Sequence, residues 1–269
     1  MQLTHNMYSL SIYKNYKAAV SKNSQAVETL SSGKKLNSAK DNPNKIDDSD
    51  KLKISILSRK AASSNIQDTN SMVQTFDGAL QELNNNVSRL KELTIKGESG
   101  TISDADSVTI KKEKDSILSS INELANNTKF NGVKLSQADG TTKKATIGSE
   151  SDETVDIPFE DVTTTGLGLD SLTSMDSEQA LKAIDASCSK IASLRSKYGA
   201  IESRLEDSQN NNDEITDTLS SAQSSLEDAD IATESINNAS TKILIQAGTS
   251  LMVQSNQLPQ DVLNILSSV

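Results

Sequence analysis

The scarcity of helix breakers constrains this chain more than any other feature of its sequence. Its 269 residues include three prolines, Pro43, Pro158 and Pro259, so the intervals 44–157 and 159–258 contain none. Proline removes a backbone donor and clashes with the preceding turn, so intervals without it can form long helices. The chain is therefore expected to consist mainly of long α-helices.

Apolar residues recur at helical spacing in the first of these intervals. The 3-4-3-4-3 spacing of a coiled-coil seam occurs at Val73, Phe76, Leu80, Leu83, Val87 and Leu90. A helix over about 44–97 would be roughly 80 Å long at 1.5 Å per residue. Gly97 and Gly100 are expected to end it.

A second, shorter helix is expected after these glycines. Asp104 is predicted as its N-cap, and the helix should stop before Lys129, because Asn131-Gly132 is a turn dipeptide. Its predicted inner face consists of Val108, Ile117, Ile121 and Leu124.

The segment 133–175 changes character, because Ser, Thr, Asp and Gly dominate it. Two short stretches, 144–148 and 153–157, have the composition of β-strands. We expect a small β-hairpin with loops in this segment.

The helical pattern returns at about residue 176 and persists. Its seam is predicted at Leu194, Tyr198, Ile201, Leu205, Ile215, Leu219, Ala222 and Leu226, with polar Ser208 and Asn212 at the intervening seam positions. Cys188 belongs to the same apolar stripe upstream, where a small core residue is the favoured interpretation.

Both ends of the chain are also helical in pattern, with sparser apolar residues. The N-terminal stripe is Leu10, Tyr13, Val20, Val27 and Leu30, and the C-terminal stripe is Ile236, Ala239, Ile243, Ala247 and Leu251. Pairing the two terminal helices is the economical arrangement, although such a pair is marginal alone. We expect it to become ordered when it packs against copies of itself.

Composition limits how thick the body can be. Hydrophobic residues make up 34 % of the chain, aromatic residues 3 %, and tryptophan is absent. Large aromatic and aliphatic side chains usually fill a thick core. The predicted fold is therefore a mostly α, elongated long-helix coiled-coil bundle with a small β-hairpin and with its N- and C-terminal helices paired.

Charge and hydropathy exclude several classes of partner. A net charge of −10 argues against nucleic acid and against anionic membrane surfaces, which both require a basic face. No apolar run approaches the roughly 20 residues of a membrane span. The N-terminus lacks the basic and apolar regions of a cleaved signal peptide, so by this criterion alone the protein would be cytosolic.

The sequence offers little for catalysis. His5 is the only histidine, so a two-histidine zinc motif is impossible within one chain. Asp47, Asp48 and Asp50 lack the glycine and distal glutamate of a calcium loop. We predict no enzyme, no metal site and no cofactor.

Five segments of the chain carry recognisable motifs. The first, Leu30-Ser-Ser-Gly-Lys-Lys-Leu-Asn-Ser-Ala-Lys-Asp41, is similar to the N-terminal signature of bacterial flagellins, and Phe130-Asn-Gly-Val-Lys-Leu135 resembles the turn after their second helix. Arg195-Ser-Lys-Tyr-Gly-Ala-Ile-Glu-Ser-Arg-Leu-Glu206 resembles the long C-terminal core helix. Glu227-Asp-Ala-Asp-Ile-Ala-Thr-Glu234 and Gln246-Ala-Gly-Thr-Ser-Leu-Met-Val-Gln-Ser-Asn-Gln-Leu-Pro-Gln260 match the C-terminal signatures. All five occur in family order and spacing.

The resemblance implies a domain plan. Residues 1–43 and 227–269 would form the inner-core terminal helix pair. Residues 44–226 would form the outer-core helical domain, with the β-hairpin and loop insert at about 133–175. This is a short form with core domains only, because only about 40 residues separate the core halves, and the large variable outer domains of many flagellins are missing.

The resemblance also implies a function, a location and partners. The chain would polymerise with itself into the extracellular flagellar filament for motility, after type III export without a cleaved signal peptide. Its other partners would be an export chaperone and the cap and hook-junction proteins. Burial of the terminal stripes would drive assembly, through Leu10, Val20, Leu30, Ile243, Ala247 and Leu251.

One receptor site is implied residue by residue. Flagellins that the host Toll-like receptor for flagellin recognises carry an Arg and a Leu four residues apart, with a Glu on the next helix, which match Arg89, Leu93 and Glu113. Arg89 and Leu93 would share one helix face, and an exposed Arg beside a Leu is a plausible hot spot. The alternative is that these residues serve subunit packing.

Other functions stay open as alternatives. A hook–filament junction protein has the same fold but a different C-terminal signature. A secreted coiled-coil adhesin or export-tip protein would form small oligomers and has no reason to carry all five motifs. An enzyme is the weakest alternative, because no constellation of residues supports it.

Overall fold

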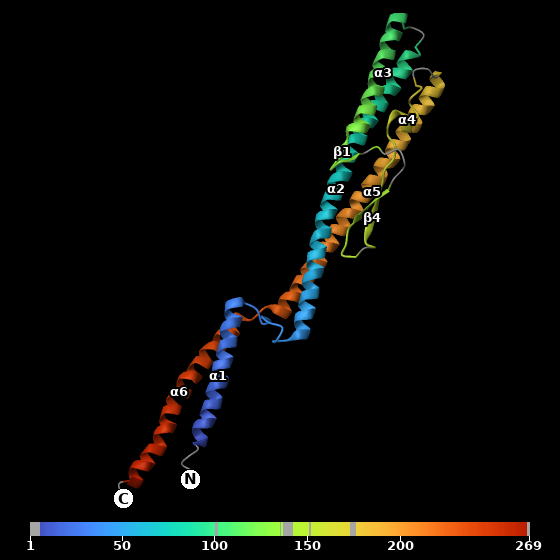
Figure 1. Ribbon diagram of the computed structural model, residues 1–269. Helices are drawn as coiled ribbons and strands as arrows, with labels where there is room; N and C mark the ends of the chain where they lie inside the picture. The colour runs from blue at the N-terminus through green and yellow to red at the C-terminus, as the bar shows by residue number, and fades with distance from the viewer. Residues whose placement is uncertain are drawn as a thin grey trace. The chain divides into compact units, whose positions relative to one another are not determined.

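The computed structural model describes residues 6–99, 102–134, 136, 142–150, 152–172 and 176–267, and side chains as far as residue 257. Over these ranges the chain forms six helices and two antiparallel strand pairs (Figure 1). The elements in chain order are α1 Met7–Ser32, α2 Pro43–Gly97, α3 Asp104–Asn127, β1 Lys129–Phe130, β2 Val133–Lys134, β3 Thr142–Thr146, β4 Thr154–Pro158, α4 Thr164–Leu167, α5 Ser177–Glu227 and α6 Ile231–Ser267. The prediction of long helices with a small hairpin is confirmed.

The chain forms two compact units. One comprises Met1–Ile54 and Thr218–Val269, and the other comprises Ser55–Asp217. Helices α2 and α5 each contribute residues to both.

Local signals in the sequence explain where the long helices begin and end. The Asn42 side chain accepts a hydrogen bond from the Lys45 amide (3.2 Å) just before α2, whose first residue is Pro43, a favoured position for proline. The N-cap of α3 is Ser103, whose side chain accepts from the Asp106 amide. The prediction of Asp104 as the N-cap is therefore wrong by one residue, because the Ser103 hydroxyl accepts the hydrogen bond from a free backbone amide of the first turn.

The predicted seam of α2 is the core of the unit Ser55–Asp217. All six seam residues from Val73 to Leu90 are fully buried. They pack against the buried α5 residues Ile184, Ile191, Leu194, Tyr198 and Leu205. The Phe76 ring meets Phe159 edge-on at a centroid distance of 5.7 Å. Phe76, Phe159 and Tyr198 are thus the aromatic residues that fill the core of this unit.

Strand β4 and the segment after it form an additional layer over this core. Val155, Ile157, Phe159 and Val162 are buried in the same cluster. The Tyr198 hydroxyl donates to the carbonyl oxygen of Pro158 (3.0 Å). Lys190 Nζ donates to the carbonyl oxygen of Gly166 (2.9 Å), which fixes the α4 segment on α5. The loop-rich insert is therefore part of the core.

One predicted inner-face residue of α3 is outside the core. Val108 is 53 % exposed, whereas Ile110, Ile121 and Ala125 are buried. The inward face of the first turns is therefore set by Ile110, whose Cγ2 lies 3.6 Å from the position of a Cβ on Gly97. The prediction for Val108 is wrong because nine residues separate it from Ile117, which places the two on opposite sides of the helix, whereas Ile110 lies seven residues before Ile117 and shares its face.

The strands form two hairpins. Strands β3 and β4 pair antiparallel with Lys144 opposite Asp156, so the predicted hairpin is confirmed within two residues of its expected bounds. The shorter β1–β2 hairpin turns at Asn131 (φ 46°) and Gly132 (φ 80°). Two positive φ angles are typical of a type I′ turn, which Asn-Gly favours.

In the unit formed by the chain ends, α1 and α6 lie side by side and antiparallel (Figure 1). Asn6 Nδ2 donates to the Ser255 carbonyl oxygen (2.8 Å) at one end, and the Thr241 hydroxyl donates to Asn23 Oδ1 (3.2 Å) further along. The predicted pairing of the terminal helices is confirmed. Gly33, with φ 71°, ends α1 as a left-handed cap, a conformation that glycine adopts without a steric penalty.

Candidate assembly surfaces

The α1/α6 pair has a seam that consists largely of small and polar residues. On each helix the least exposed side chains recur at alternating steps of three and four. The seam residues are Ile12, Tyr16, Ala19, Asn23, Ala26 and Leu30 on α1, and Asn238, Thr241, Ile245, Gly248, Met252 and Ser255 on α6.

Small side chains allow a close approach within this seam. A Cβ on Gly248 would lie 3.4 Å from Tyr16 Cδ2 and 4.0 Å from its Cα. Ala19 and Ala26 are buried opposite α6. These residues let the two helices approach closely, while Leu10, Val20, Ile243 and Leu251 lie on other faces.

The structure places the predicted assembly residues mostly outside the seam. Leu10, Val20, Ile243 and Leu251 are between 40 % and 64 % exposed, and Ala247 is exposed too. Leu30 differs, because it is half-buried and occupies a seam position. The sequence pattern detected large apolar residues, whereas intrachain pairing uses small ones, which such a pattern passes over.

Two adjoining grooves follow one edge of the pair. The first, of about 440 Å³, is lined by Ile12, Asn15, Tyr16, Ala18, Ala19, Lys22, Thr241, Leu244, Ala247, Gly248 and Leu251. The second, of about 700 Å³, shares Lys22, Thr241 and Leu244 with it. Its other lining residues include Lys35, Lys40, Asp41 and Glu234, so it is polar.

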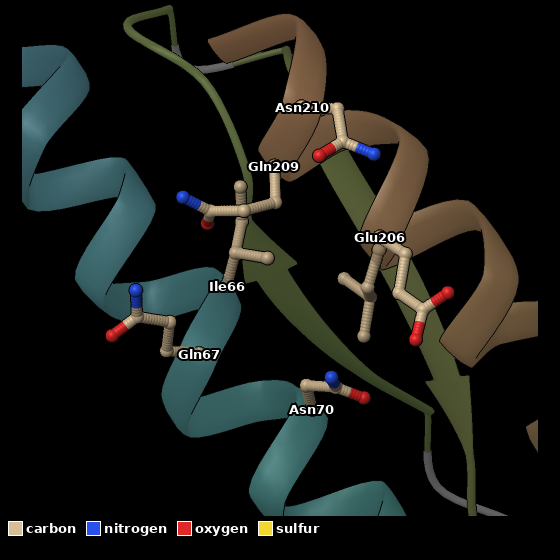
Figure 2. A pocket seen from close by; sticks show the side chains of 7 residues that line it. Ile66, Gln67, Asn70, Glu206, Gln209 and Asn210 are labelled. Atoms are coloured by element: carbon tan, nitrogen blue, oxygen red, sulfur yellow. The ribbon is translucent and has the colours of Figure 1, made fainter. Parts of the chain in front are cut away.

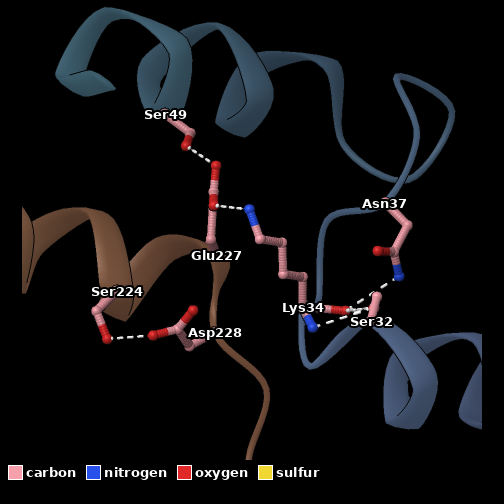
Figure 3. A network of polar contacts seen from close by, with 7 residues as sticks. All are labelled: Ser32, Lys34, Asn37, Ser49, Ser224, Glu227 and Asp228. Carbon is pink, nitrogen blue, oxygen red and sulfur yellow. Dashed lines mark hydrogen bonds and ion pairs between the residues drawn. The ribbon is translucent and has the colours of Figure 1, made fainter. Parts of the chain in front are cut away.

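A polar network joins three segments of the same unit (Figure 3). Glu227, at the end of α5, accepts hydrogen bonds from Lys34 Nζ (2.7 Å) and from the Ser49 hydroxyl of α2 (2.5 Å). Lys34 and Ser49 together hold the pKa of the Glu227 carboxyl below its ordinary value. Backbone bonds from the Lys35 amide to the Glu227 carbonyl (2.6 Å) and from the Ala229 amide to the Gly33 carbonyl (2.9 Å) continue the connection.

Beyond the apolar seam, toward the N-terminal end of α2, the contact between α2 and α5 becomes polar. Arg59 Nη1 donates to Asn212 Oδ1 (3.2 Å), and Asn212 Nδ2 returns a bond to the Arg59 carbonyl oxygen (2.8 Å). Asn212 is buried at a predicted seam position. A pocket of about 220 Å³ follows, with Asn70 on α2 and Gln209 on α5 (Figure 2). The buried Oδ1 of Asn70 and Oε1 of Gln209 have no hydrogen-bond partner within the described part of the chain.

The three residues of the implied receptor site have different environments. Arg89 Nη2 pairs with Glu113 Oε1 (2.8 Å), and its Nη1 pairs with Glu92 Oε2 (2.9 Å). Arg89 and Glu113 are about half exposed. Leu93 is 2 % exposed. Arg89 is thus exposed as expected, whereas the Leu93 side chain is covered in the folded chain, and the receptor role of the three residues stays a prediction.

Cys188 is half-buried against the apolar core, and this burial raises the pKa of its thiol. His5 lies outside the described residues. Among the described residues, no group of three or more His, Cys, Asp or Glu could hold a metal ion. None of the described helices combines the length and apolarity that a membrane crossing requires.

A helix pair that turns its large apolar side chains outward is the kind of surface that subunits of an assembly use. Comparison with known proteins identifies the assembly. Residues 3–141 match the bacterial flagellin N-terminal helical region, and residues 181–266 match the bacterial flagellin C-terminal helical region. The chain therefore belongs to the bacterial flagellin family, whose members are structural subunits of the flagellar filament.

Individual flagellins align with nearly the full length of this chain. A flagellin of Halalkalibacterium halodurans is 30 % identical, with 99 % of this chain and 100 % of that protein aligned. A flagellin of Bacillus subtilis is also 30 % identical, again over 99 % and 100 %. A solved structure of a Vibrio parahaemolyticus protein described as flagellar hook-associated has a TM-score of 0.60, over 70 % of this chain and 100 % of that one. Its sequence identity of 14 % indicates a shared fold alone.

Proposed function

We propose that copies of this chain polymerise through the α1/α6 pair, with a purely structural and non-enzymatic role. The exposure of Leu10, Val20, Ile243 and Leu251 carries the proposal. When a neighbouring subunit covers an exposed aliphatic side chain, the free energy falls by about 25 cal/mol for each Å² of apolar surface buried. In a filament this gain repeats in every subunit.

The proposal assigns a place to each part of the chain. Residues 1–43 and 227–269 form the inner core, and residues 44–226 form the outer core with its β-hairpin insert. The separation of the terminal helices from Ser55–Asp217 as a compact unit supports this division.

Substitution of the exposed aliphatic residues tests the assembly role. Leu251→Asp or Ile243→Asp should abolish seeded polymerisation, because a carboxylate would have to be buried at the subunit contact. Ser250→Asp is the matched control, since it adds the same charge to α6 at an exposed polar position. Circular dichroism should show that α2, α3 and α5 still fold in all three variants. Normal filaments from Leu251→Asp and Ile243→Asp would contradict the inner-core assignment.

Family membership supports the remaining parts of the proposal. The subunit is exported to the cell exterior without a cleaved signal peptide, and its partners are an export chaperone and the cap and hook-junction proteins. Secretion assays in strains that lack each partner would test these contacts, and unchanged secretion and filament growth would contradict them.

Arg89 and Glu113 act at the surface, either with the host Toll-like receptor for flagellin or with neighbouring subunits. Their half exposure supports a surface role, whereas the buried Leu93 supports the helix packing beneath them. Arg89→Ala should reduce receptor-reporter activation if the first role holds and polymerisation if the second holds. Normal receptor activation and normal polymerisation by Arg89→Ala would show that Arg89 has neither role.

A further inference from the structure

We infer that growth uses a head-to-tail contact in which an apolar row on α1 of one copy enters the groove beside α6 of the next copy. This inference rests on the proposed polymerisation through the α1/α6 pair. It specifies which surface of one copy meets which surface of another.

The row consists of four large side chains on one side of α1. We call it the α1 row: Leu10, Tyr13, Val20 and Val27, which are 40–51 % exposed. Tyr13, Val20 and Val27 are seven residues apart, and each directly follows a seam residue, so they lie along a single edge of the pair.

The groove lies along the other edge. We call it the α6 groove: the cavity of about 440 Å³ whose apolar wall on α6 consists of Leu244, Ala247 and Leu251. Leu244 and Leu251 directly precede seam residues, which places them on the opposite edge from positions that follow the seam. From α1 the lining residues are Ile12, Asn15, Tyr16, Ala18, Ala19 and Lys22, and no member of the α1 row is among them.

The two edges are complementary in composition. On the row edge, the large apolar side chains come from α1, and α6 contributes Lys242 and Gln246. On the groove edge, the large apolar side chains Leu244 and Leu251 come from α6, and α1 contributes Asn15 and Lys22. At the base of the groove, Tyr16 of the same chain packs close to Gly248.

A second copy of the chain is the occupant that fits these observations. The groove is continuous with the α1/α6 interface, because Ile12, Tyr16 and Ala19 line both. The chain also belongs to a family of filament subunits. When the α1 row of each copy docks in the α6 groove of the next copy, the assembly has a free α1 row at one end and a free α6 groove at the other. Such heterologous contacts build open helical polymers, whereas row-to-row contacts would close as two-fold dimers.

Paired cysteines test the arrangement. In a Cys188→Ser background, Val20→Cys is combined in one chain with Leu244→Cys, Ala247→Cys or Leu251→Cys. After polymerisation and mild oxidation, non-reducing electrophoresis should show a ladder of covalent multimers for at least one combination, because each copy then bonds to two neighbours. The corresponding single-cysteine variants should stay monomeric on the gel.

Two results would overturn the inference while leaving the proposed function intact. They are disulfide-linked dimers from Val20→Cys alone, and normal filaments in which none of the three combinations gives a ladder. If the Cys188→Ser chain itself forms no filaments, the proposed polymerisation fails instead.

A second pair of variants covers the case in which the cysteine chains do not assemble. Val20→Asp keeps an intact α6 groove, and Leu251→Asp keeps an intact α1 row. Added to growing wild-type seeds, only one of the two variants can dock at a given end and block it, so the two should differ in their effect on elongation at that end. Equal effects of Val20→Asp and Leu251→Asp on elongation at the same end would contradict row-into-groove docking.

Discussion

At the scale of single residues, Arg89 and Leu93 are one helical turn apart yet serve different purposes. The Leu93 side chain is buried, whereas the Arg89 guanidinium pairs with Glu92 and Glu113 at the surface. Sequence spacing alone gives the two residues the same face. The burial of Leu93 follows from the three-dimensional packing of the unit, which helical spacing does not give.

Shortening the buried Leu93 side chain should therefore lower the stability of the folded chain. Leu93→Ala should lower the free energy of unfolding by about 2–4 kcal/mol, since it leaves a cavity in the packed interior. Arg89→Ala should leave the denaturation midpoint unchanged, because exposed ion pairs add little. Urea unfolding followed by circular dichroism would measure both. Equal midpoints for Leu93→Ala and the wild type would mean that Leu93 is not part of the core.

Glu227 makes a prediction about pH at the same scale. Hydrogen bonds from Lys34 and Ser49 lower the pKa of its carboxyl in the folded chain. A lowered folded pKa means that the charged carboxylate stabilises the fold above the ordinary Glu pKa, and that this contribution disappears as the pH falls through the folded value. The junction of Lys34, Ser49 and Glu227 should thus loosen in acid.

Glu227→Gln should remove this dependence. The loss at neutral pH should be at most about 1 kcal/mol, because Lys34 is half exposed and water screens the pair. Hydrogen exchange at the amides of Lys35 and Ala229, which bond across the junction, would report the change. Lys51→Gln, which removes an exposed pair with Asp47, is the control. An unchanged pH profile in Glu227→Gln would refute the role of Glu227.

At the scale of elements, the helix pairs differ in how they achieve contact. The α2/α5 packing uses large apolar seam residues, which the sequence pattern predicts directly. The α1/α6 seam uses Ala19, Ala26, Asn23, Thr241 and Gly248, whose hydropathy does not separate them from surface residues. The pairing of the terminal helices was predictable, but the residues that make it were not.

Two asparagines near the α2/α5 pocket should respond in opposite ways. Asn212→Leu should destabilise the fold by about 1–3 kcal/mol, because it breaks two bonds with Arg59 and leaves buried polar groups unpaired. Asn70→Leu should be neutral or stabilising, because it removes an unpaired buried oxygen. Thermal unfolding of the two variants compares them directly, and a lower melting temperature for Asn70→Leu would indicate a partner for its side chain.

The sequence also predicted the β3–β4 hairpin but not its role. Alternation and turn composition locate the strands, whereas the burial of Val155, Ile157 and Phe159 depends on residues far away in the chain. Phe76 and Tyr198 complete that cluster from α2 and α5. Such long-range packing has no local signal, which is why the sequence located the hairpin but not its place in the core.

At the scale of the whole molecule, the exposed apolar residues of α1 and α6 have one consistent explanation. The intrachain seam is satisfied without them, and the family to which the chain belongs forms filaments. Assembly would cover the α1 row and the α6 groove at the same time. On this proposal, the two edges of one helix pair would supply both contact surfaces that a subunit needs for polymerisation.

A cryo-electron microscopy reconstruction of filaments grown from the purified chain tests this account most directly. We predict that Val20 and Tyr13 of one subunit lie in van der Waals contact with Leu244 or Leu251 of a neighbour. A reconstruction in which subunits touch only through residues 55–217, with the α1 row and the α6 groove facing solvent, would contradict it.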